Sequence, residues 1–489
     1  MEGINRGSGH YRDPEVAELS AASFEAPVDI GKRVEPFVDD WLIEEMDGVK
    51  LELHHPAPRE IALRFDAPWE GATSYYPSVV KDDRYRLYYR ASGYTTRQVM
   101  CYAESDDGIN WNRPSLGIEE FEGSTENNIF WAGERTDRSS DSSHNLSVFK
   151  DSNPDAAREE QYKGLGGGVY ALSSGDSINW RKVRDEPVMS PYEKCEAPND
   201  YISGGFWDAV GGQYVAYLRG WRSSRSTVRQ CDEPGPPYGN RGKLRQVLRS
   251  TSPDFVNWSE PRFVDFGDSP LEHFYTFGAT PYFRAPHVFL AFPMRFLPKR
   301  KKMEDHKWSG VSDTVLLSSR DGVHWDRRFM EGFIPPGRDP NNWTQRSNMT
   351  GCGIVPTGPD EISLYYIEHY RHPTCRLRRA TLRTDGFVSV RADYGGGTFV
   401  TRPLTFGERE LVINYSTSAA SSIKVEIRDT DGQPIPGRTF EDSEEIYGDE
   451  IDHAVRWTEG RDPGGLVGHT VRLAFAMKDA DLYSIRFRS

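Results

Sequence analysis

The chain is poor in cysteine, and its few cysteines follow no metal-binding spacing. Only five occur among 489 residues, namely Cys101, Cys195, Cys231, Cys352 and Cys375, and no two form a Cys-x-x-Cys pair. This scatter favours neither a zinc site nor a dense disulfide framework. We therefore expect no metal site, and the odd number is more typical of a reducing compartment.

Long apolar runs are also missing. Residues 1–30 are polar and charged, without the apolar stretch of a signal peptide. No later segment approaches the roughly 20 apolar residues that a membrane-spanning helix needs. The sequence thus predicts a soluble protein, either cytoplasmic or, if a signal peptide has been removed, periplasmic or secreted.

Positive charge is in deficit. The chain has 60 lysines and arginines against 74 aspartates and glutamates, a formal net charge of −14. Nucleic acids and anionic membranes select basic surfaces, so we expect neither as a partner. What is present is a composition of 12% aromatic residues with 45 glycines and 32 prolines. It is typical of many short strands and turns, and it supplies aromatic rings that can stack on sugars.

One eight-residue pattern recurs and suggests a repeat architecture. It spans residues 104–111, 173–180, 251–258 and 318–325, each ending in tryptophan, with a weaker copy at 383–390. The intervals of roughly 70 residues are typical of tandem structural repeats. Each copy predicts a tight hairpin in which Gly or Asp takes the positive-φ position. Five hairpins predict an all-β fold with a five-bladed β-propeller.

The chain divides into three predicted regions. Residues 1–33 lack apolar periodicity and are expected to form an N-terminal arm. Residues 34–397 carry the repeats and form the propeller, in which a strand near residues 33–46 would close the ring by pairing with the last blade. Residues 398–489 contain alternating strands at short spacing, which predicts a C-terminal β-sandwich.

Blade geometry predicts where the functional residues gather. In each blade the second strand runs antiparallel to the inner strand, so it ends near the place where the inner strand begins. Polar side chains at these ends should therefore meet around one mouth of the central channel. The residues concerned are Glu70, Tyr75, Arg90, His144, Asn145, Asp200, Arg219, Glu272, His273, Arg295, Arg346, Asn348, Glu368 and His369.

These residue types suit the chemistry of acidic or neutral sugars. Carboxylates that face each other across a pocket can cleave a glycosidic bond, one as acid and the other as base or nucleophile. Arg90, Arg219, Arg295 and Arg346 could clamp a uronate, sulfate or phosphate, or could instead neutralise the carboxylates. The histidines could orient a substrate, ligate an ion in the channel, or make structural hydrogen bonds.

Several motifs resemble those of a known superfamily. They are Phe37-Val-Asp-Asp-Trp-Leu-Ile43, Pro68-Trp-Glu70, Glu272-His-Phe-Tyr275, Pro281-Tyr-Phe-Arg-Ala-Pro286 and Gly448-Asp-Glu450. With them, residues 33–489 resemble the five-bladed propeller glycosidases, which include arabinanases, β-xylosidases, invertases and mannoside phosphorylases. More closely, they resemble a bacterial group of glycosyl-hydrolase-like proteins.

The resemblance implies roles for three carboxylates. Glu272 stands near the place of the general acid, Asp200 lies about two residues from the place of the pKa-modulating aspartate, and Glu70 is the carboxylate nearest to the place of the base. At the usual base position this chain has Tyr76 before Pro77, and the Asn-Asp-Pro-Asn-Gly segment of invertases is absent.

Together, these features predict a glycoside hydrolase that acts on a polysaccharide-derived oligosaccharide without a cofactor. Glu272 would be the acid, with Glu70 or Asp200 as base or nucleophile. Two alternatives stay open. One is a glycoside phosphorylase, in which the arginines bind phosphate, and the other is a glycan-binding propeller without catalytic activity.

Overall fold

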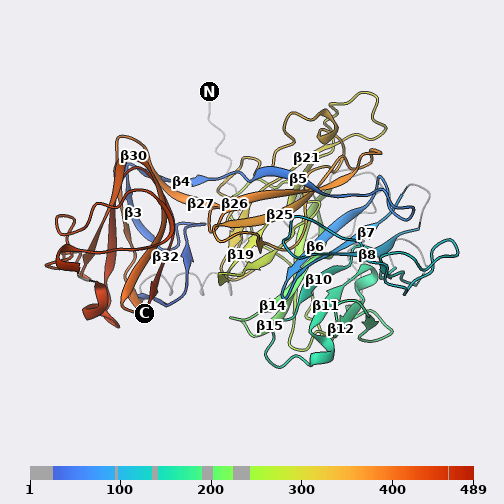
Figure 1. Ribbon diagram of the computed structural model, residues 1–489, viewed down its shortest axis with the longest axis horizontal. Coiled ribbons are helices and arrows are strands. Elements are labelled where there is room, and N and C mark those ends of the chain that lie inside the picture. The colour runs from blue at the N-terminus through green and yellow to red at the C-terminus, as the bar shows by residue number, and fades with distance from the viewer. Residues whose placement is uncertain (1–25, 94–96, 135–140, 190–201, 224–242, 461) are drawn as a thin grey trace, which may run out of the picture. The chain divides into compact units, whose positions relative to one another are not determined.

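The computed structural model describes residues 26–93, 97–134, 141–189, 202–223, 243–460 and 462–489. Its regular structure is almost entirely β-strand, which confirms the all-β prediction (Figure 1). The helices are single 3₁₀ turns, namely η1 (Arg158–Glu160), η2 (Gly167–Val169), η4 (Pro340–Asn342), η5 (Thr458–Gly460) and η6 (Pro463–Leu466). Over the residues described, no helix has the length and apolar character needed to cross a membrane.

Two compact units make up the chain. The repeat unit comprises Leu53–Trp221 and the described part of Gln230–Phe387, and the C-terminal unit comprises the described residues up to Glu52 together with Val388–Ser489. The sequence had placed 34–52 and 388–397 with the propeller. In the structure β3 (Ile43–Asp47) pairs with β28 (Gly397–Thr401), β27 (Val388–Ala392) pairs with β32 (Arg472–Arg488), and β4 (Val49–Leu53) pairs with β27.

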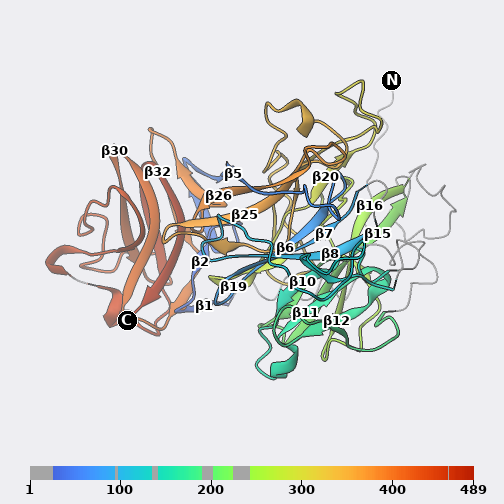
Figure 2. The ribbon, with the colours of Figure 1, turned by 45° about the vertical axis from the view of Figure 1, so that its right-hand side comes forward.

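The repeat unit contains five successive antiparallel sheets, and Figure 2 shows several of them side by side. In the first, β7 is buried along its whole length. The first three sheets are β6 (Tyr75–Lys81), β7 (Tyr85–Ala91), β8 (Val99–Ser105) and β9 (Ile129–Trp131); β10 (Ser147–Lys150), β11 (Tyr162–Leu165), β12 (Ala171–Ser174) and β13 (Arg181–Lys182); and β14 (Ile202–Asp208), β15 (Gln213–Ser223), β16 (Lys243–Ser252) and β17 (Arg262–Phe263).

The fourth and fifth sheets depart from this plain order. The fourth is β18 (Thr280–Tyr282), β19 (Ala285–Ala291) and β22 (Leu317–Ser319), with a separate hairpin of β20 (Met294–Leu297) and β21 (Val311–Thr314) inserted between β19 and β22. The fifth is β23 (Met349–Thr350), β24 (Val355–Pro356), β25 (Glu361–Glu368) and β26 (Arg376–Arg383), and it is completed by β5 (Ala57–Arg64) from the start of the unit.

The strand that completes the last sheet is not the one the sequence suggested. Residues 33–46 were expected to pair with the last repeat, but β5 pairs with β26 instead, with Leu63 opposite Leu377. Arg59 donates from Nε to Oγ1 of Thr381, 2.9 Å away and 322 positions along the chain. An N-terminal strand does pair with the last sheet, but it is β5 and not a strand within residues 33–46.

The four copies of the pattern that end in tryptophan form the same turn, whereas in the weaker copy at 383–390 Asp385 itself has a positive φ and its carboxylate accepts from Tyr282. In each of the four, an aspartate carboxylate accepts hydrogen bonds from the backbone N–H groups two and three residues later and from the side chain three residues later; these aspartates are Asp107, Asp176, Asp254 and Asp321. The next residue has φ between 66° and 73°, and it is Gly108, Ser177, Phe255 or Gly322. These aspartates are structural, as predicted, although Ser177 and Phe255 take the position expected for Gly or Asp.

We expect this turn to make the protein sensitive to acid. Burial disfavours the charged carboxylate of Asp254, but the N–H groups of Asn257 and Val256 outweigh this and lower its pKa to about 2. A folded pKa below the unfolded value stabilises the protein above about pH 4, and this contribution is lost as the pH falls towards 2. Asp254→Ala should therefore reduce the fall in stability between about pH 5 and pH 2, as measured by denaturant unfolding.

Asp155→Ala is the matched control for this prediction. The Asp155 side chain is exposed, and its carboxylate accepts no hydrogen bond from any residue that the structure describes. The stability of Asp155→Ala should therefore fall between about pH 5 and pH 2 as much as that of the natural protein. An unchanged pH profile in the Asp254 variant would contradict the role given to the turn.

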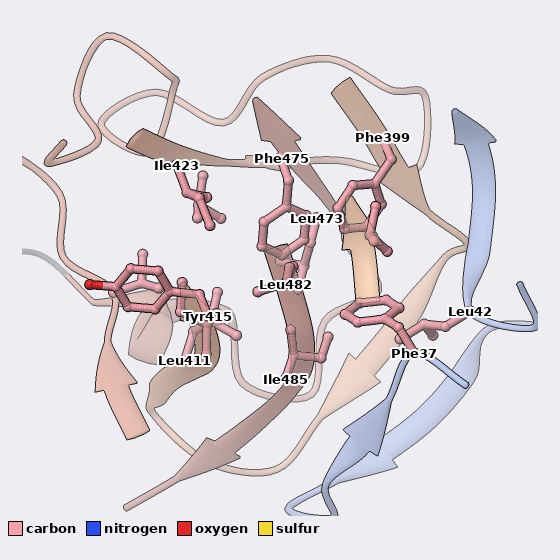
Figure 3. Packing of buried hydrophobic residues seen from close by; sticks show 14 of the residues in the cluster. Phe37, Leu42, Phe399, Leu411, Tyr415, Ile423, Leu473, Phe475, Leu482 and Ile485 are labelled. Carbon is pink, nitrogen blue, oxygen red and sulfur yellow. The ribbon is translucent and has the colours of Figure 1, made fainter. Parts of the chain in front are cut away.

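The C-terminal unit has its own apolar core, shown in Figure 3. Its two long strands are β30 (Glu410–Arg428) and β32, which pair with each other over most of their length. Phe475 of β32 stacks on Phe399 of β28 with ring centroids 4.7 Å apart. The remaining strands are β1 (Val28–Gly31), β2 (Glu35–Pro36), β4 (Val49–Leu53), β29 (Leu404–Phe406) and β31 (Asp449–Ala454).

Candidate functional site

The five sheets share a feature at the start of their first strands. One residue there has a positive φ in every case: Tyr76, Asn145, Gly204, Gly278 and Asn348, with values of 54°, 60°, 145°, 59° and 65°. Three of these are not glycine, and left-handed backbone at such residues costs about 1–3 kcal/mol each. Tyr76, Asn145 and Gly278 also line one cavity between the first strands, with Met349 beside them.

Contacts between neighbouring sheets join this region into one cluster, which we call the mouth cluster. The ring of Tyr76 lies 6.4 Å from that of His144, and Oη of Tyr75 donates to the backbone oxygen of Arg346 at 2.5 Å. Arg346 in turn contacts Tyr275, over which the guanidinium of Arg245 also lies. Of the residues predicted to converge, Tyr75, His144 and Arg346 lie in this cluster.

Arg346 occupies a cage of tyrosines. Its guanidinium lies 5.1 Å from the ring centroid of Tyr275 and 4.9 Å from that of Tyr370, and Nη1 donates to Oη of Tyr275 at 2.5 Å. Its backbone φ of 62° is strained for a non-glycine residue. This conformation carries the side chain between the two rings.

Other arginines stack on aromatic rings beside this cage. The guanidinium of Arg245 lies 4.6 Å from the ring of Trp221, on which Arg219 also rests at 5.4 Å. Arg371 lies 4.2 Å from the ring of Trp308 and donates to Oε1 of Gln345 at 2.7 Å. The sequence had singled out Arg219 but neither Arg245 nor Arg371, because the rings of Trp221 and Trp308 on which these two stack lie far from them along the chain.

A pair of carboxylates, Glu272 and Asp313, is bound to Arg295 of the β20–β21 hairpin. Nε and Nη2 of Arg295 donate to the two oxygens of Asp313 at 2.9 and 2.5 Å, while Nη1 donates to Oε1 of Glu272 at 3.2 Å. Oε2 of Glu272 accepts from Nε and Nη2 of Arg327 at 3.1 and 3.0 Å. Arg295 lies directly opposite Asp313 in the β20–β21 ladder, so the hairpin fixes the position of the arginine against the aspartate. Asp313 was not among the predicted residues.

His273 follows Glu272 and is held in a positive environment. Its Nδ1 accepts from the backbone N–H of Arg245 at 3.1 Å. Burial, together with the charge of Arg245, lowers the pKa of His273 to about 4. At neutral pH this imidazole is therefore uncharged, so it can accept a hydrogen bond but adds no positive charge to the mouth cluster.

Glu368 and His369 belong to a separate ion network. Arg376 and Arg378 donate to Oε2 of Glu368 at 2.7 and 2.8 Å, and they lower the pKa of Glu368 although burial opposes this. Nε2 of His369 lies 2.8 Å from Oδ2 of Asp339, and its Nδ1 lies 2.7 Å from Oγ1 of Thr374. Burial and Arg376 lower the pKa of His369. Both ring nitrogens are thus engaged within the protein.

Several other predicted residues are buried or half-buried and are held by hydrogen bonds within the protein. Nη1 of Arg90 donates to Oδ1 of Asn145 at 3.0 Å, and Nη2 donates to the backbone oxygen of Thr73 at 2.9 Å. Nδ2 of Asn348 donates to the backbone oxygens of Ser312 and Asn342. Tyr75 and Asn348 have no exposed surface. The half-buried His144 pairs through Nδ1 with Oε1 of Gln98 at 2.6 Å.

Glu70 is buried, and Asp200 lies outside the described residues. The Glu70 side chain has 0% exposure and accepts hydrogen bonds from Tyr89 at 2.5 Å, from Arg113 at 2.6 Å and from the backbone of Ala67 at 3.0 Å. Burial raises the pKa of Glu70, although these three partners oppose it. A carboxylate enclosed in this way favours a structural role, which was the alternative to its assignment as base.

Replacing Glu70 separates the two roles. Glu70→Gln keeps the size of the side chain, so we expect turnover within a few-fold of the natural protein. Glu70→Ala should instead lower stability by about 1–3 kcal/mol, because the buried hydroxyl of Tyr89 loses its acceptor. Denaturant unfolding and an activity assay on the same preparations test this, and a loss of turnover in a stable glutamine variant would restore Glu70 as a catalytic candidate.

No group of three or more metal-ligating side chains occurs in the portion of the chain that the structure describes. The three described cysteines, Cys101, Cys352 and Cys375, form no disulfide. The mouth cluster therefore has to be interpreted from its arginines, aromatic rings and carboxylates.

Comparisons with known proteins give structural likeness at low identity. No family model and no curated protein sequence matches the chain. A glycosyl hydrolase from Bacteroides ovatus is similar in structure at 13% identity, covering 71% of this chain and 96% of its own length, with a TM-score of 0.39. An N-acetylgalactosamine deacetylase from F. plautii, solved with blood group B trisaccharide, shares 12% identity over 69% and 96%, with a TM-score of 0.42.

The solved structures similar to this chain include further glycoside hydrolases. One is a family 43 arabinoxylan arabinofuranohydrolase from Bacillus subtilis, with 11% identity, coverage of 86% of this chain and 96% of that one, and a TM-score of 0.39. At these TM-scores the likeness assigns neither an activity nor a substrate. Function has to be inferred from the chain's own side chains.

Proposed function

We infer that the repeat unit is a five-bladed β-propeller and that the C-terminal unit is a β-sandwich. The inference is supported by the five successive sheets, by the cavity lined by first strands of several sheets, and by the completion of the last sheet by β5. A propeller closes its ring in this manner. The catalytic domain would then span 53–387.

We propose that this domain is a glycoside hydrolase whose active site is the mouth cluster, acting on an oligosaccharide with an acidic sugar. The observation that carries the proposal is the pair of carboxylates, Glu272 and Asp313, held on the single guanidinium of Arg295. Glycosidic cleavage needs two such groups flanking one bond. The aromatic rings and arginines of the mouth cluster would supply surfaces for a sugar ring and for a negative charge.

The two carboxyl groups would share the work of acid and base. Glu272 would protonate the leaving oxygen, while ionised Asp313 would take the proton of an attacking water or attack the anomeric carbon itself. Arg295 would orient both groups. Asp200, which the structure does not describe, stays a prediction for the pKa-modulating carboxylate.

A substrate screen tests this function. Neutral, uronate-containing and sulfated oligosaccharides should be incubated with the full-length protein, with and without inorganic phosphate, and released reducing ends measured. Hydrolysis of acidic glycans without phosphate is the expected result. If reducing ends are released only when phosphate is present, the protein is a phosphorylase and not a hydrolase. Binding without cleavage over the whole panel would leave a glycan-binding propeller.

A further inference from the structure

Arg346 is a largely enclosed cation without an acidic partner. No carboxylate lies within ion-pair distance of its guanidinium among the residues that the structure describes, and its buried Nε has no hydrogen-bond partner there. Its nearest groups are the neutral Tyr275 and Tyr370. Stacking on aromatic rings offsets part of the cost of burying a cation, but not all of it. The site is thus electrostatically unbalanced towards positive charge.

The neighbouring arginines increase this imbalance. Arg245 lies over the same Tyr275 ring at 4.9 Å, and Arg371 lies 5.8 Å from the ring of Tyr370. Burial and the charge of Arg346 lower the pKa of Arg371, which indicates that the two guanidinium groups repel each other. Three cations therefore gather around two tyrosine rings in a protein whose net charge is −14.

The nearby carboxylates do not relieve this charge. Both oxygens of Glu272 accept hydrogen bonds from Arg295 and Arg327, and both oxygens of Asp313 accept from Arg295. Arg295, one of the four arginines proposed from the sequence as an anion clamp, therefore forms ion pairs with carboxylates of the protein itself. Arg90 is taken up by Asn145 and a backbone oxygen. Arg346, like Arg90, has no carboxylate partner among the described residues, so its charge is not neutralised by a side chain there.

We propose that Arg346, supported by Arg245 and Arg371, binds the negatively charged group of an acidic sugar, either a uronate carboxylate or a sulfate ester. The flat guanidinium suits two-point contact with such an oxyanion, and the adjoining rings of Trp221 and Trp308 are placed to take an apolar sugar face. The proposal rests on the proposed function only in taking the ligand to be a sugar. It assigns the anion to residues other than the carboxylate pair.

Equilibrium binding tests the proposal independently of catalysis. Titration calorimetry on the full-length protein would use glucuronate, galactose 6-sulfate, glucose and inorganic phosphate as probes. We expect binding of a charged sugar and none of glucose. Arg346→Met, which keeps the length and apolar contacts of the side chain, should weaken charged-sugar binding by about ten- to a hundredfold.

The stability of the unliganded variant gives a second readout. Removing an unpaired buried cation should leave the melting temperature unchanged or raise it, whereas removing a structural arginine would lower it. If Arg346→Met does not fold, Tyr275→Phe removes the hydroxyl that accepts from Nη1 and should weaken binding several-fold. Arg300→Met is the matched control, because it makes the same charge change on an exposed loop and should keep full affinity.

The outcomes separate this proposal from the one on catalysis. Charged-sugar binding that survives in a folded Arg346→Met, or that glucose matches, would overturn the anion site. Phosphate binding tighter than that of either charged sugar would assign the site to free phosphate instead. The titration measures binding without cleavage, so a failure of the hydrolase proposal leaves the binding result intact.

Discussion

Glu272→Gln is expected to lower the turnover of the best glycan substrate by about two to four orders of magnitude, the usual contribution of a general acid. The amide has nearly the same shape but carries no proton that it can transfer to the leaving oxygen. Asp313→Asn should cause a loss of similar size, because the second carboxylate of the pair would be missing. Initial rates over a range of substrate concentrations and pH values measure both effects.

The controls address the structural role of the same carboxylate. Glu272 also anchors Arg295 and Arg327, so each variant has to be shown folded by its melting temperature. Glu331→Gln, at an exposed position close by in the sequence, should leave turnover unchanged. If a folded Glu272→Gln keeps its turnover within a few-fold and changes only KM, Glu272 positions the arginines and the acid must be sought elsewhere.

Phe475→Ala is expected to destabilise the C-terminal unit by about 3–5 kcal/mol, the usual cost of deleting a buried phenylalanine ring. The ring has 0% exposure and stacks almost parallel on Phe399, with 9° between the planes. The cavity left in Figure 3 would lie among Phe399, Leu473 and their neighbours, where paired strands leave little room to collapse.

Local measurements are preferable for this variant, because a chain of two units need not unfold in one step. Hydrogen exchange should speed up in β30 and β32, which pair with each other. Tyr394→Ala removes a ring that is 66% exposed and serves as the control. Exchange rates in β30 that stay the same in Phe475→Ala would contradict the view that this ring supports the core.

Local chemistry made part of the fold predictable. The turn around Asp107 needs only its own aspartate, the residues that follow and a position of positive φ, so the eight letters of the pattern were sufficient. The partner of a strand is different, because it depends on residues far away. The alternation in residues 33–46 predicts a strand, but it could not reveal that β28 rather than the last repeat pairs with Ile43–Asp47.

The candidate site was predictable to a similar extent. Placing residues by strand ends found Arg346 of the mouth cluster and the ion pair of Glu272 with Arg295. It missed Asp313, because that residue lies within a strand of the inserted β20–β21 hairpin, which the repeat does not contain. It also misjudged Glu70, whose spacing suited the mouth, while the turn at 67–70 directs its side chain to Tyr89 and Arg113.

The joining of β5 to β26 has a consequence for biosynthesis. On the ribosome, Ala57–Arg64 emerges early but must wait for more than three hundred further residues before its partner strand exists. Contacts of such high sequence separation slow folding and leave an unpaired strand edge open to other chains in the meantime. The nascent protein should therefore depend on chaperones until this late closure, and fragments that end before Arg376 should aggregate.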